Sequence, residues 1–255
     1  MTEETKKVET PEEKKPNFFE QTIVFIIPAR DSVPVEFFAA YEGLLKPANN
    51  RLMIRYTEPS DRNLNELVTQ VLSGKTVPTY IAILNTKVLP VRGTLARLWS
   101  DNVDCVAALS FDGSHPFFPA IYTNLANDKV GVALEYERDK LIKVDQIALD
   151  FVLLKTEALK KIAPPYFEFG IDKNGARTIS MEKTLCDKFK AAGVDIYVDP
   201  KATVARLHKS FITEEWWLRS KDEYMEKRMI ELKKSPEEAA KRPSGTTEIK
   251  TEESK

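Results

Sequence analysis

The chain has 255 residues, and its 38 lysines and arginines against 39 aspartates and glutamates give a formal net charge of −1 at pH 7. This balance excludes the surplus of positive charge that draws a protein onto nucleic acid or an anionic membrane surface. The two cysteines, Cys105 and Cys186, are too few for a disulfide framework and are not spaced with histidines as zinc ligands.

Both ends of the chain are rich in charge and poor in apolar residues. Residues 1–17 carry nine charged side chains and only two apolar ones, and residues 235–255 are similar. Such segments cannot bury enough surface to offset the entropy lost on ordering. We expect two disordered tails, a folded domain over 18–212 and a last helix over 213–234.

The sequence shows no targeting or membrane signal. No apolar stretch reaches the length needed to span a bilayer, and the N-terminus lacks the apolar core of a signal peptide. We therefore expect a cytoplasmic protein without a transmembrane segment. Lysine and glutamate lead the charged residues, a composition similar to that of thermophile proteins.

Short apolar runs predict strands in the first half of the chain, at 22–28, 51–57, 79–84 and 103–109. Runs that are apolar at nearly every position are typical of strands buried on both faces. Between them, helical periodicity appears over 64–72, after Ser60 and Asp61 as candidate caps, and helices are also expected at 37–45 and 94–99. The alternation predicts an α/β fold with an open, mainly parallel sheet and helices on both faces.

The second half of the chain predicts a smaller antiparallel portion. Strand candidates follow one another with little room for helices, at 119–123, 130–136, 141–147 and 151–154. A helix is expected to begin after Ser180 and to end at Gly193, because a glycine commonly follows the last turn. Strands at 196–198 and 203–207 complete the folded domain.

A long amphipathic helix is predicted over 213–234. One stripe of its apolar side chains, including Trp217, is expected to pack on the folded domain. Trp216 and Ile230 project from another side, which leaves a homodimer contact or a membrane contact as alternatives. Because six acidic residues balance six basic ones, the helix gains little from anionic lipid, and packing within the chain is favoured.

The loops after the first three predicted strands, 28–31, 57–61 and 85–87, are where an open α/β sheet binds its ligands. The sequence contains neither the G-x-G-x-x-G fingerprint of dinucleotide-binding folds nor a complete P-loop. The residues alone therefore leave the ligand open.

A series of short motifs occurs in and after these loops. The motifs are Ile27-Pro28-Ala29-Arg30-Asp31, Arg55-Tyr56-Thr57-Glu58-Pro59-Ser60, Asn65-Glu66-Leu67-Val68, Val144-Asp145, Ala163-Pro164-Pro165-Tyr166-Phe167-Glu168-Phe169 and Gly193-Val194-Asp195-Ile196-Tyr197-Val198-Asp199-Pro200. Their order and spacing over residues 22–208 resemble those of family-2-like glycosyltransferases with the GT-A fold, a Rossmann-like α/β fold.

The resemblance implies a reaction in which a sugar passes from a nucleoside-diphosphate sugar to an acceptor, either a glycan, a lipid or a protein. In the family, a D-x-D motif holds Mn²⁺ or Mg²⁺ against the diphosphate, where positive charge stabilises the leaving group. An acidic residue deprotonates the acceptor hydroxyl and makes it a better nucleophile.

In this chain the D-x-D position reads Asn85-Thr86-Lys87, and the family's second metal ligand corresponds to Arg206, with His208 two residues further on. A hard divalent cation without carboxylate ligands is held poorly, so no metal ligand is assigned. Lys87 is expected to neutralise the diphosphate as a point charge. Two alternatives follow: a metal-independent transferase, or an inactive GT-A-like domain that binds a nucleotide or a protein partner.

The resemblance also assigns roles to single residues. Glu182 corresponds to the family's catalytic base and is expected in the first turn of a helix, where the partial positive charge of the N-terminus favours a carboxylate. The same placement is also common helix-capping chemistry. Asp150 is the second candidate base, and the loop residue His115 is a candidate substrate contact. The candidate ligands of the nucleotide donor are Pro28, Arg30, Asp31, Glu58, Asn65, Asn85, Lys87 and Arg206.

Overall fold

The computed structural model describes residues 17–29, 32–56, 60–113, 117–124, 130–171 and 175–207. The two tails, the helix predicted over 213–234 and several loop residues lie outside the described residues. The predictions for the tails and for the packing of Trp216 and Trp217 therefore stay predictions.

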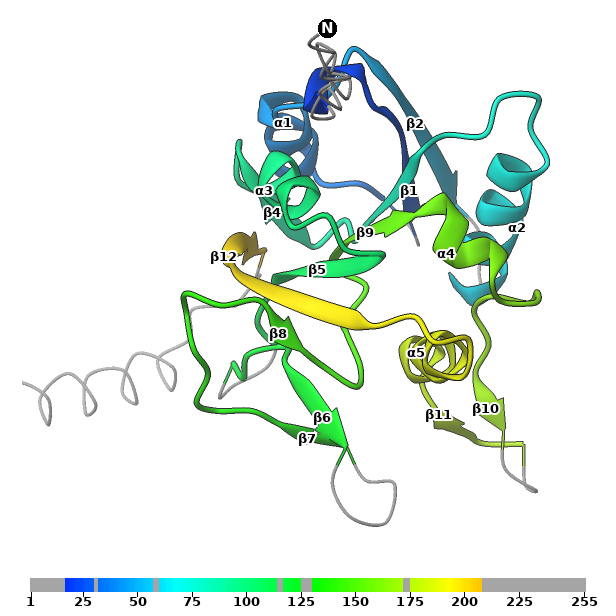
Figure 1. The fold of residues 1–255 in the computed structure, drawn as a ribbon, viewed down its shortest axis with the longest axis vertical. Helices are drawn as coiled ribbons and strands as arrows, with labels where there is room; N and C mark the ends of the chain where they lie inside the picture. Colours follow the sequence, from blue (N-terminus) through cyan, green and yellow to red (C-terminus); the bar gives the residue numbers. More distant parts are fainter. Residues whose placement is uncertain are drawn as a thin grey trace, which may run out of the picture. The chain divides into compact units, whose positions relative to one another are not determined.

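One large mixed sheet dominates the described part of the chain (Figure 1). Its strands follow the order β2-β1-β3-β9-β5-β12-β4, and β8 pairs with β12 beside this path. The strands are β1 (Thr22–Ala29), β2 (Asn49–Tyr56), β3 (Tyr80–Leu84), β4 (Val88–Pro90), β5 (Cys105–Leu109), β8 (Ile142–Lys143), β9 (Phe151–Lys155) and β12 (Ile196–Arg206). Strand β1 runs parallel to β2 and β3, and β5 runs parallel to β12, so the predicted mainly parallel sheet is confirmed.

Strand β9 lies antiparallel between β3 and β5 and joins the two parallel halves of the sheet. The sequence predicts a strand at 151–154 among the antiparallel strands of the second half; β9 is antiparallel, but it lies inside the large sheet and not in the smaller portion. The first four residues of β9 are buried, as expected for a strand covered on both faces. A run of this kind shows that a strand is central without showing which strands flank it.

Strands β12 and β4 also differ from the prediction. The two short strands expected at 196–198 and 203–207 form the single strand β12, whose pairing with β5 is irregular between Asp199 and Thr203. The end of β12 pairs antiparallel with β4, which was not predicted. Three residues are too few for a periodic pattern to reveal a strand.

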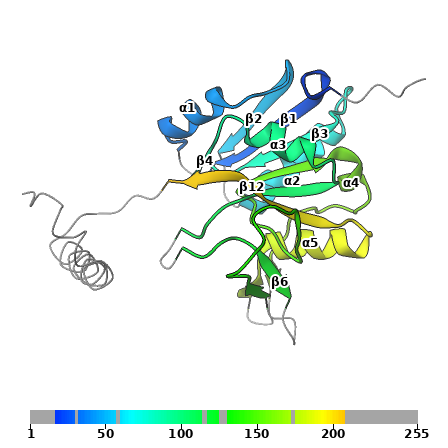
Figure 2. The ribbon, with the colours of Figure 1, turned by 60° about the vertical axis from the view of Figure 1, so that its left-hand side comes forward.

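Helices cover both faces of the sheet, as predicted (Figures 1 and 2). The helices α2 (Ser60–Leu72), α4 (Thr156–Lys160) and α5 (Met181–Ala191) contribute to one apolar core, and α1 (Val35–Gly43) and α3 (Thr94–Ser100) contribute to the other. A short 3₁₀ turn, η1 (Phe18–Glu20), precedes β1. Helix α5 has the predicted termini, because the Ser180 side chain accepts a hydrogen bond from the Lys183 N–H and Gly193 has a φ of 70°.

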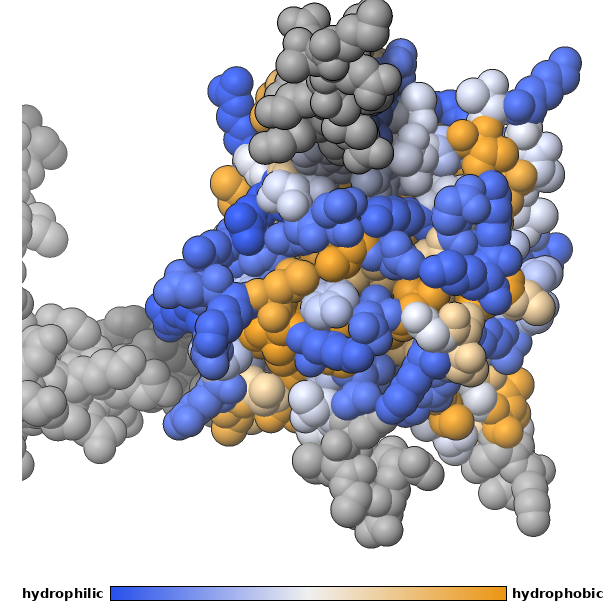
Figure 3. Space-filling view, viewed as in Figure 1, coloured by the Kyte–Doolittle hydropathy of each residue, from blue (hydrophilic) through white to orange (hydrophobic). Residues whose placement is uncertain are grey.

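Two small antiparallel sheets accompany the large one. One consists of β6 (Tyr122–Asn124) and β7 (Val130–Val132), which correspond to the strands predicted at 119–123 and 130–136. The other consists of β10 (Gly170–Ile171) and β11 (Arg177–Ile179), which were not predicted. Gly170 approaches its partner strand closely, since a Cβ there would lie 2.7 Å from the Cβ of Ile179. The space-filling view in Figure 3, taken from the same side as Figure 1, shows many hydrophilic side chains, and apolar groups are exposed near β10 and β11. Ile171 and Ile179, in these two strands, are exposed.

A pair of carboxyl groups lies where α3 contacts β12. The buried Asp199 accepts hydrogen bonds from Arg97 Nε at 2.5 Å and from the Lys201 N–H at 2.9 Å. The Asp101 side chain is only 6% exposed, and its Oδ2 has no hydrogen-bond partner among the described residues. Burial, and then the negative charge of Asp199, raise the pKa of Asp101 to about 7 despite the nearby Arg97 guanidinium.

This carboxyl pair predicts a stability that depends on pH. Because the folded-state pKa of Asp101 lies above its ordinary value of 3.8, the folded chain binds more protons than the unfolded chain between these values. The contribution of Asp101 to stability is therefore fully present below pH 4 and is lost as the pH rises through 7. We expect Asp101→Asn, which mimics the protonated carboxyl, to raise the free energy of unfolding at pH 8 by on the order of 2 kcal/mol.

Chemical denaturation of the wild type and Asp101→Asn between pH 4 and 8 measures this effect. The variant should show a flatter dependence of the free energy of unfolding on pH. Parallel pH profiles for the two proteins would contradict the assignment of a raised pKa to Asp101.

Candidate functional site

The carboxyl ends of the parallel strands lie at one edge of the sheet. Ala29 and Tyr56, the last residues of β1 and β2, pair with each other, and Leu84 at the end of β3 pairs with Phe151 at the start of β9. The segment after β3 therefore lies beside the residue before β9, and the Asn85 N–H donates to the Asp150 carbonyl at 2.8 Å. This is the edge at which the sequence predicts a ligand site.

Asp150 is the most heavily engaged polar residue of this edge. It is 3% exposed, and its Oδ2 accepts a hydrogen bond from Ser110 Oγ at 2.7 Å and forms an ion pair with Arg206 Nη2. Its Oδ1 accepts from Asn85 Nδ2 at 3.2 Å. Asp150 is thus in direct contact with two other predicted site residues, Asn85, which is 65 residues away in sequence, and Arg206, which is 56 residues away. A buried carboxylate with three donors is poorly placed to take a proton from a substrate, so the geometry favours a positioning role for Asp150 over that of second base.

Arg206 connects the end of β12 to the segment after β5. Its Nε donates to the Phe111 carbonyl at 2.6 Å, while its Nη2 reaches Asp150. Gly113, two residues after Phe111, lies close as well, since a Cβ there would be 3.6 Å from Arg206 Cδ. The Arg206 side chain keeps 20% exposure, so part of it borders the solvent at this edge.

The segment at the D-x-D position forms a tight turn. The Lys87 N–H donates to Asn85 Oδ1 at 2.9 Å, and the Leu207 N–H donates to the Lys87 carbonyl at 2.7 Å. Both polar atoms of the Asn85 side chain are used within the protein. The Lys87 side chain is exposed and carries no hydrogen bond or ion pair to any described residue.

The residues at this position do not suit a divalent metal ion. The Asn85 side-chain oxygen accepts from the Lys87 N–H, and the one carboxylate in contact with Asn85 among the described residues, Asp150, is already paired with Arg206. Within the described residues no three His, Cys, Asp or Glu side chains are grouped as metal ligands. His208, the remaining candidate ligand, lies outside the described residues.

Glu182 lies in the first turn of α5, as predicted. Ser180 caps this helix, and Met181 Sδ lies 4.0 Å from Ser60 Oγ, so the starts of α5 and α2 are adjacent. Glu182 is half-buried, and its carboxylate has no hydrogen bond or ion pair within the described part of the chain.

The pKa of the Tyr122 phenol responds to several charged residues of this edge. Burial raises the pKa of the Tyr122 phenol, and the negative charges of Asp112, Asp150 and Glu182 raise it further, while Arg206 opposes them. Tyr122 and Ser110 were not predicted from the sequence, because neither belongs to a motif of the resembled family.

Of the remaining residues predicted to bind the nucleotide donor, one is engaged within the protein, one lies in a strand, and the others lie outside the described residues. Asn65 Oδ1 accepts from the N–H groups of Tyr166 and Phe167, and its Nδ2 donates to the Asp61 and Phe167 carbonyls. This side chain fixes the segment before β10, which leaves its amide little capacity for a nucleotide. Pro28 lies in β1 opposite Arg55. Arg30, Asp31, Glu58 and His115 lie outside the described residues.

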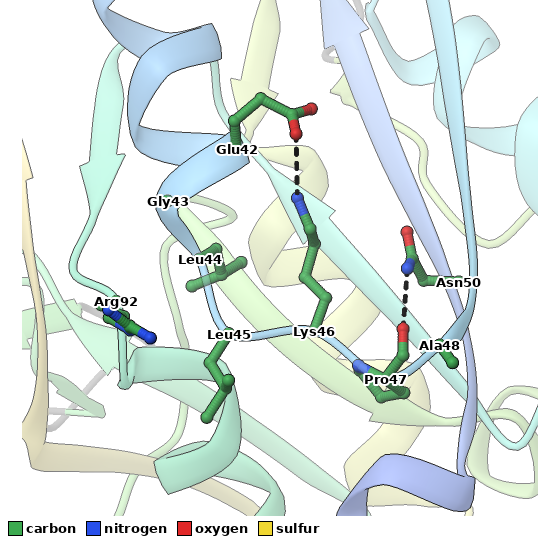
Figure 4. Close-up of a pocket in the computed structure, with 9 residues that line it drawn as sticks. All are labelled: Glu42, Gly43, Leu44, Leu45, Lys46, Pro47, Ala48, Asn50 and Arg92. Atoms are coloured by element: carbon green, nitrogen blue, oxygen red, sulfur yellow. Dashed lines mark hydrogen bonds and ion pairs between the residues drawn. The ribbon is translucent and has the colours of Figure 1, made fainter.

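A pocket of about 550 Å³ lies elsewhere in the molecule (Figure 4). It is lined by the segment from α1 to β2 and by Arg92, and so lies at the beginning of β2 and not at its carboxyl end. Lys46 donates to the Tyr41 carbonyl at 2.7 Å and lies 3.9 Å from the centroid of the Tyr41 ring. Lys46 thus stabilises the C-terminal end of α1. The Asn50 amide is likewise bonded to the Pro47 carbonyl.

Comparison with known proteins identifies the fold. No family model and no curated protein matches the sequence. Among solved structures, A197 from STIV matches with a TM-score of 0.51 and 15% identity, over 76% of this chain and 97% of that chain. GalNAc-T7, solved with UDP, GalNAc and Mn²⁺, matches with a TM-score of 0.53 and 8% identity, over 74% of this chain and 44% of its own. The match to the catalytic domain of Drosophila β1,4-galactosyltransferase 7 has a TM-score of 0.46.

These likenesses, at such low identity, concern the fold alone. The chain has a GT-A-like α/β fold and spans less than half of the length of GalNAc-T7. Across the described residues, no helix has the length and apolar character needed to cross a membrane.

Proposed function

We propose that this protein is a glycosyltransferase that moves a sugar from a nucleoside-diphosphate sugar to an acceptor hydroxyl without a carboxylate-held metal ion. One observation carries the proposal. At the carboxyl edge of a GT-A-like sheet, Arg206 is held by Asp150 and the exposed Lys87 follows β3, while Glu182 opens α5 with a carboxylate that has no hydrogen bond or ion pair to any described residue. The solved structure of GalNAc-T7, which shares the fold, contains UDP, GalNAc and Mn²⁺.

In the proposed reaction Glu182 accepts the proton of the acceptor hydroxyl as the oxygen attacks the anomeric carbon. The bond between that carbon and the diphosphate oxygen breaks, and the electron pair leaves with the nucleoside diphosphate. The Lys87 ammonium stabilises the negative charge that develops on the diphosphate. Arg206, fixed by Asp150 and the Phe111 carbonyl, adds positive charge to the same edge.

An inactive GT-A-like domain that binds a nucleotide or a protein is the second candidate. The ion pair between Arg206 and Asp150 favours this inactive domain, because the carboxylate nearest to the D-x-D position is then no longer free to hold a metal ion. An assay for release of nucleoside diphosphate separates the two candidates. Turnover of one donor in the presence of acceptor extracts supports the transferase. Donor binding without any release, with all donors and acceptors, supports the inactive domain.

A metal-independent site also predicts how donor binding responds to chelation and to the loss of Lys87. We expect donor affinity to be the same with and without EDTA. Lys87→Ala should weaken donor binding by about 1–3 kcal/mol, the range for loss of a hydrogen bond to a charged group. Isothermal calorimetry measures both effects, with Lys75→Ala as a control at another exposed lysine. Strict dependence on Mn²⁺ or Mg²⁺ would contradict the prediction and would favour His208 as a ligand.

A further inference from the structure

The two outer strands of the large sheet differ in how they are protected against pairing with another chain. The strand at one side, β4, has three residues and ends in a proline, Pro90. Short strands and prolines are features that keep the edge of a sheet from pairing. The strand at the other side, β2, has eight residues, contains neither proline nor lysine, and pairs with β1 in a continuous register. The β2 side of the sheet is therefore a long and regular edge.

The outer edge of β2 has no partner strand among the described residues. β2 ends the order of strands, and its backbone bonds to no described segment other than β1. A strand in this position presents a row of unpaired N–H and C=O groups to a further strand. Leu52, Met53 and Ile54, in the middle of β2, are half-buried. A further strand would satisfy the backbone groups and would cover more of this apolar surface.

The two faces of β2 belong to the two cores of the domain. Leu52 and Ile54 pack against the core that includes α1, and Met53 packs against the core that includes α2. Successive residues of a strand point to opposite faces, so Asn50 and Tyr56 lie on the same face as Leu52. Tyr56 is 51% exposed. The end of β2 therefore carries an exposed aromatic ring on the α1 side of the sheet.

A second copy of the chain can pair antiparallel with this edge around a two-fold axis. Opposite residues of such a pair share a face, so the axis lies at a residue, and only Leu52 or Met53 is central enough to pair most of the strand. With the axis at Met53, Arg51 lies opposite the partner's Arg55, and like charges directly opposite each other destabilise a sheet. With the axis at Leu52, Arg51 lies opposite the partner's Met53. In that register Arg55 lies opposite the partner's Asn49, so the charges select the axis at Leu52.

The register centred on Leu52 also brings Tyr56 to the pocket beside the start of β2 (Figure 4). Tyr56 lies opposite the partner's Ala48 in this register. Ala48 and Asn50 line the pocket of about 550 Å³, together with the C-terminal end of α1. The pocket and Tyr56 are thus on the same side of the sheet. Each subunit supplies the other with an aromatic side chain and with space to receive it.

We infer that the protein forms a two-fold symmetric dimer in which two β2 strands pair antiparallel around Leu52 and each Tyr56 enters the partner's pocket. The large sheet then continues from one subunit into the other. Two-fold dimers are the commonest oligomers, and their interface uses the same surface on both subunits. β2 meets this requirement, because its own sequence supplies an uncharged residue opposite each of its arginines. The inference does not depend on the transferase function.

Cysteine cross-linking of the full-length protein tests the register. Opposite residues of an antiparallel pair have Cα atoms about 4.5–5.5 Å apart, within the range of a disulfide. We expect Leu52→Cys to give a covalent dimer when it is treated with oxidised glutathione. Asn49→Cys is the matched control, because its two copies would lie about 20 Å apart. The native cysteines, Cys105 and Cys186, are buried, so the wild type should give no covalent dimer.

Sedimentation equilibrium measures the dimer without a cross-link. We expect the full-length wild type to be dimeric and Tyr56→Ala to weaken the dimer roughly tenfold or more, as for an aromatic residue that fills a pocket of its partner. Ile171→Ala removes another exposed apolar side chain, in β10, and should change the dissociation constant by less than about twofold. Thermal denaturation checks that each variant is folded.

The outcomes separate this dimer from other interfaces. A wild type that is monomeric at every concentration would overturn it. A covalent dimer from Asn49→Cys and not from Leu52→Cys, or equal effects of Tyr56→Ala and Ile171→Ala, would assign the contact to another surface and would also overturn it. Cross-linking through Leu52→Cys in a protein that binds no nucleotide sugar would support the dimer and contradict only the proposed function.

Discussion

Glu182→Gln should reduce the rate of sugar transfer by about 10²–10⁴-fold, the range for removal of a general base. The substitution keeps the size of the side chain and removes its charge. Glu182 carries no ion pair among the described residues, so the loss of charge should leave the fold intact. Donor affinity should change little, because a base acts on the acceptor and not on the nucleotide.

Glu157→Gln is the matched control for this substitution. Glu157 also lies in the first turn of a helix, α4, but it is paired with Lys160 at 2.7 Å and lies away from the carboxyl edge. Its substitution should leave the rate of transfer unchanged. Retention of a tenth or more of wild-type activity by Glu182→Gln would assign Glu182 to helix capping.

Arg206→Met should destabilise the folded domain by about 3–5 kcal/mol, as expected when one partner of a buried ion pair is removed. Asp150 would keep its negative charge at 3% exposure with only Ser110 and Asn85 as donors. The double variant Arg206→Met/Asp150→Asn also removes the buried negative charge that has lost its partner, and it keeps a side-chain oxygen that accepts from Asn85. It should recover at least half of the loss.

Urea denaturation of the single and double variants measures this coupling. Arg62→Met is a control, because the Arg62 side chain is 72% exposed in its ion pair with Glu66 and should cost less than about 1 kcal/mol. A loss from Arg206→Met as small as that from Arg62→Met would show that Asp150 is not held by the ion pair. It would also remove the reason for giving Asp150 a positioning role.

Local sequence patterns predicted most of the elements of the fold. The apolar runs that became β1, β3 and β5 are central strands, and such runs are found where both faces are covered. The α5 helix was predicted from Ser180 and Gly193, residues whose chemistry acts within a single turn. The place of β9 between β3 and β5 could not be predicted, because pairing depends on long-range contacts that leave no local pattern.

In the candidate site, too, local patterns could be predicted and long-range contacts could not. The carboxyl edge could be predicted from the order of strands and helices alone, and the contact of Asn85 with Asp150 lies there. The Ser110 hydroxyl and the Arg206 guanidinium converge on Asp150 from 40 and 56 residues away in sequence. No spacing rule relates them. The hydrogen bond between the Asn65 side chain and the Phe167 backbone is equally long-range. Because no local pattern reveals this bond, the sequence predicts that the Asn65 amide binds a nucleotide.

Calorimetric titration of the full-length protein with UDP-, GDP- and dTDP-sugars, in the presence of EDTA, tests the central claim most directly. The claim is that the carboxyl edge around Lys87, Arg206 and Glu182 binds a nucleoside-diphosphate sugar. We expect saturable binding of one class of nucleotide sugar, weakened by Lys87→Ala and unaffected by Glu182→Gln. Absence of heat with every donor, both in EDTA and with added Mn²⁺, would contradict the claim.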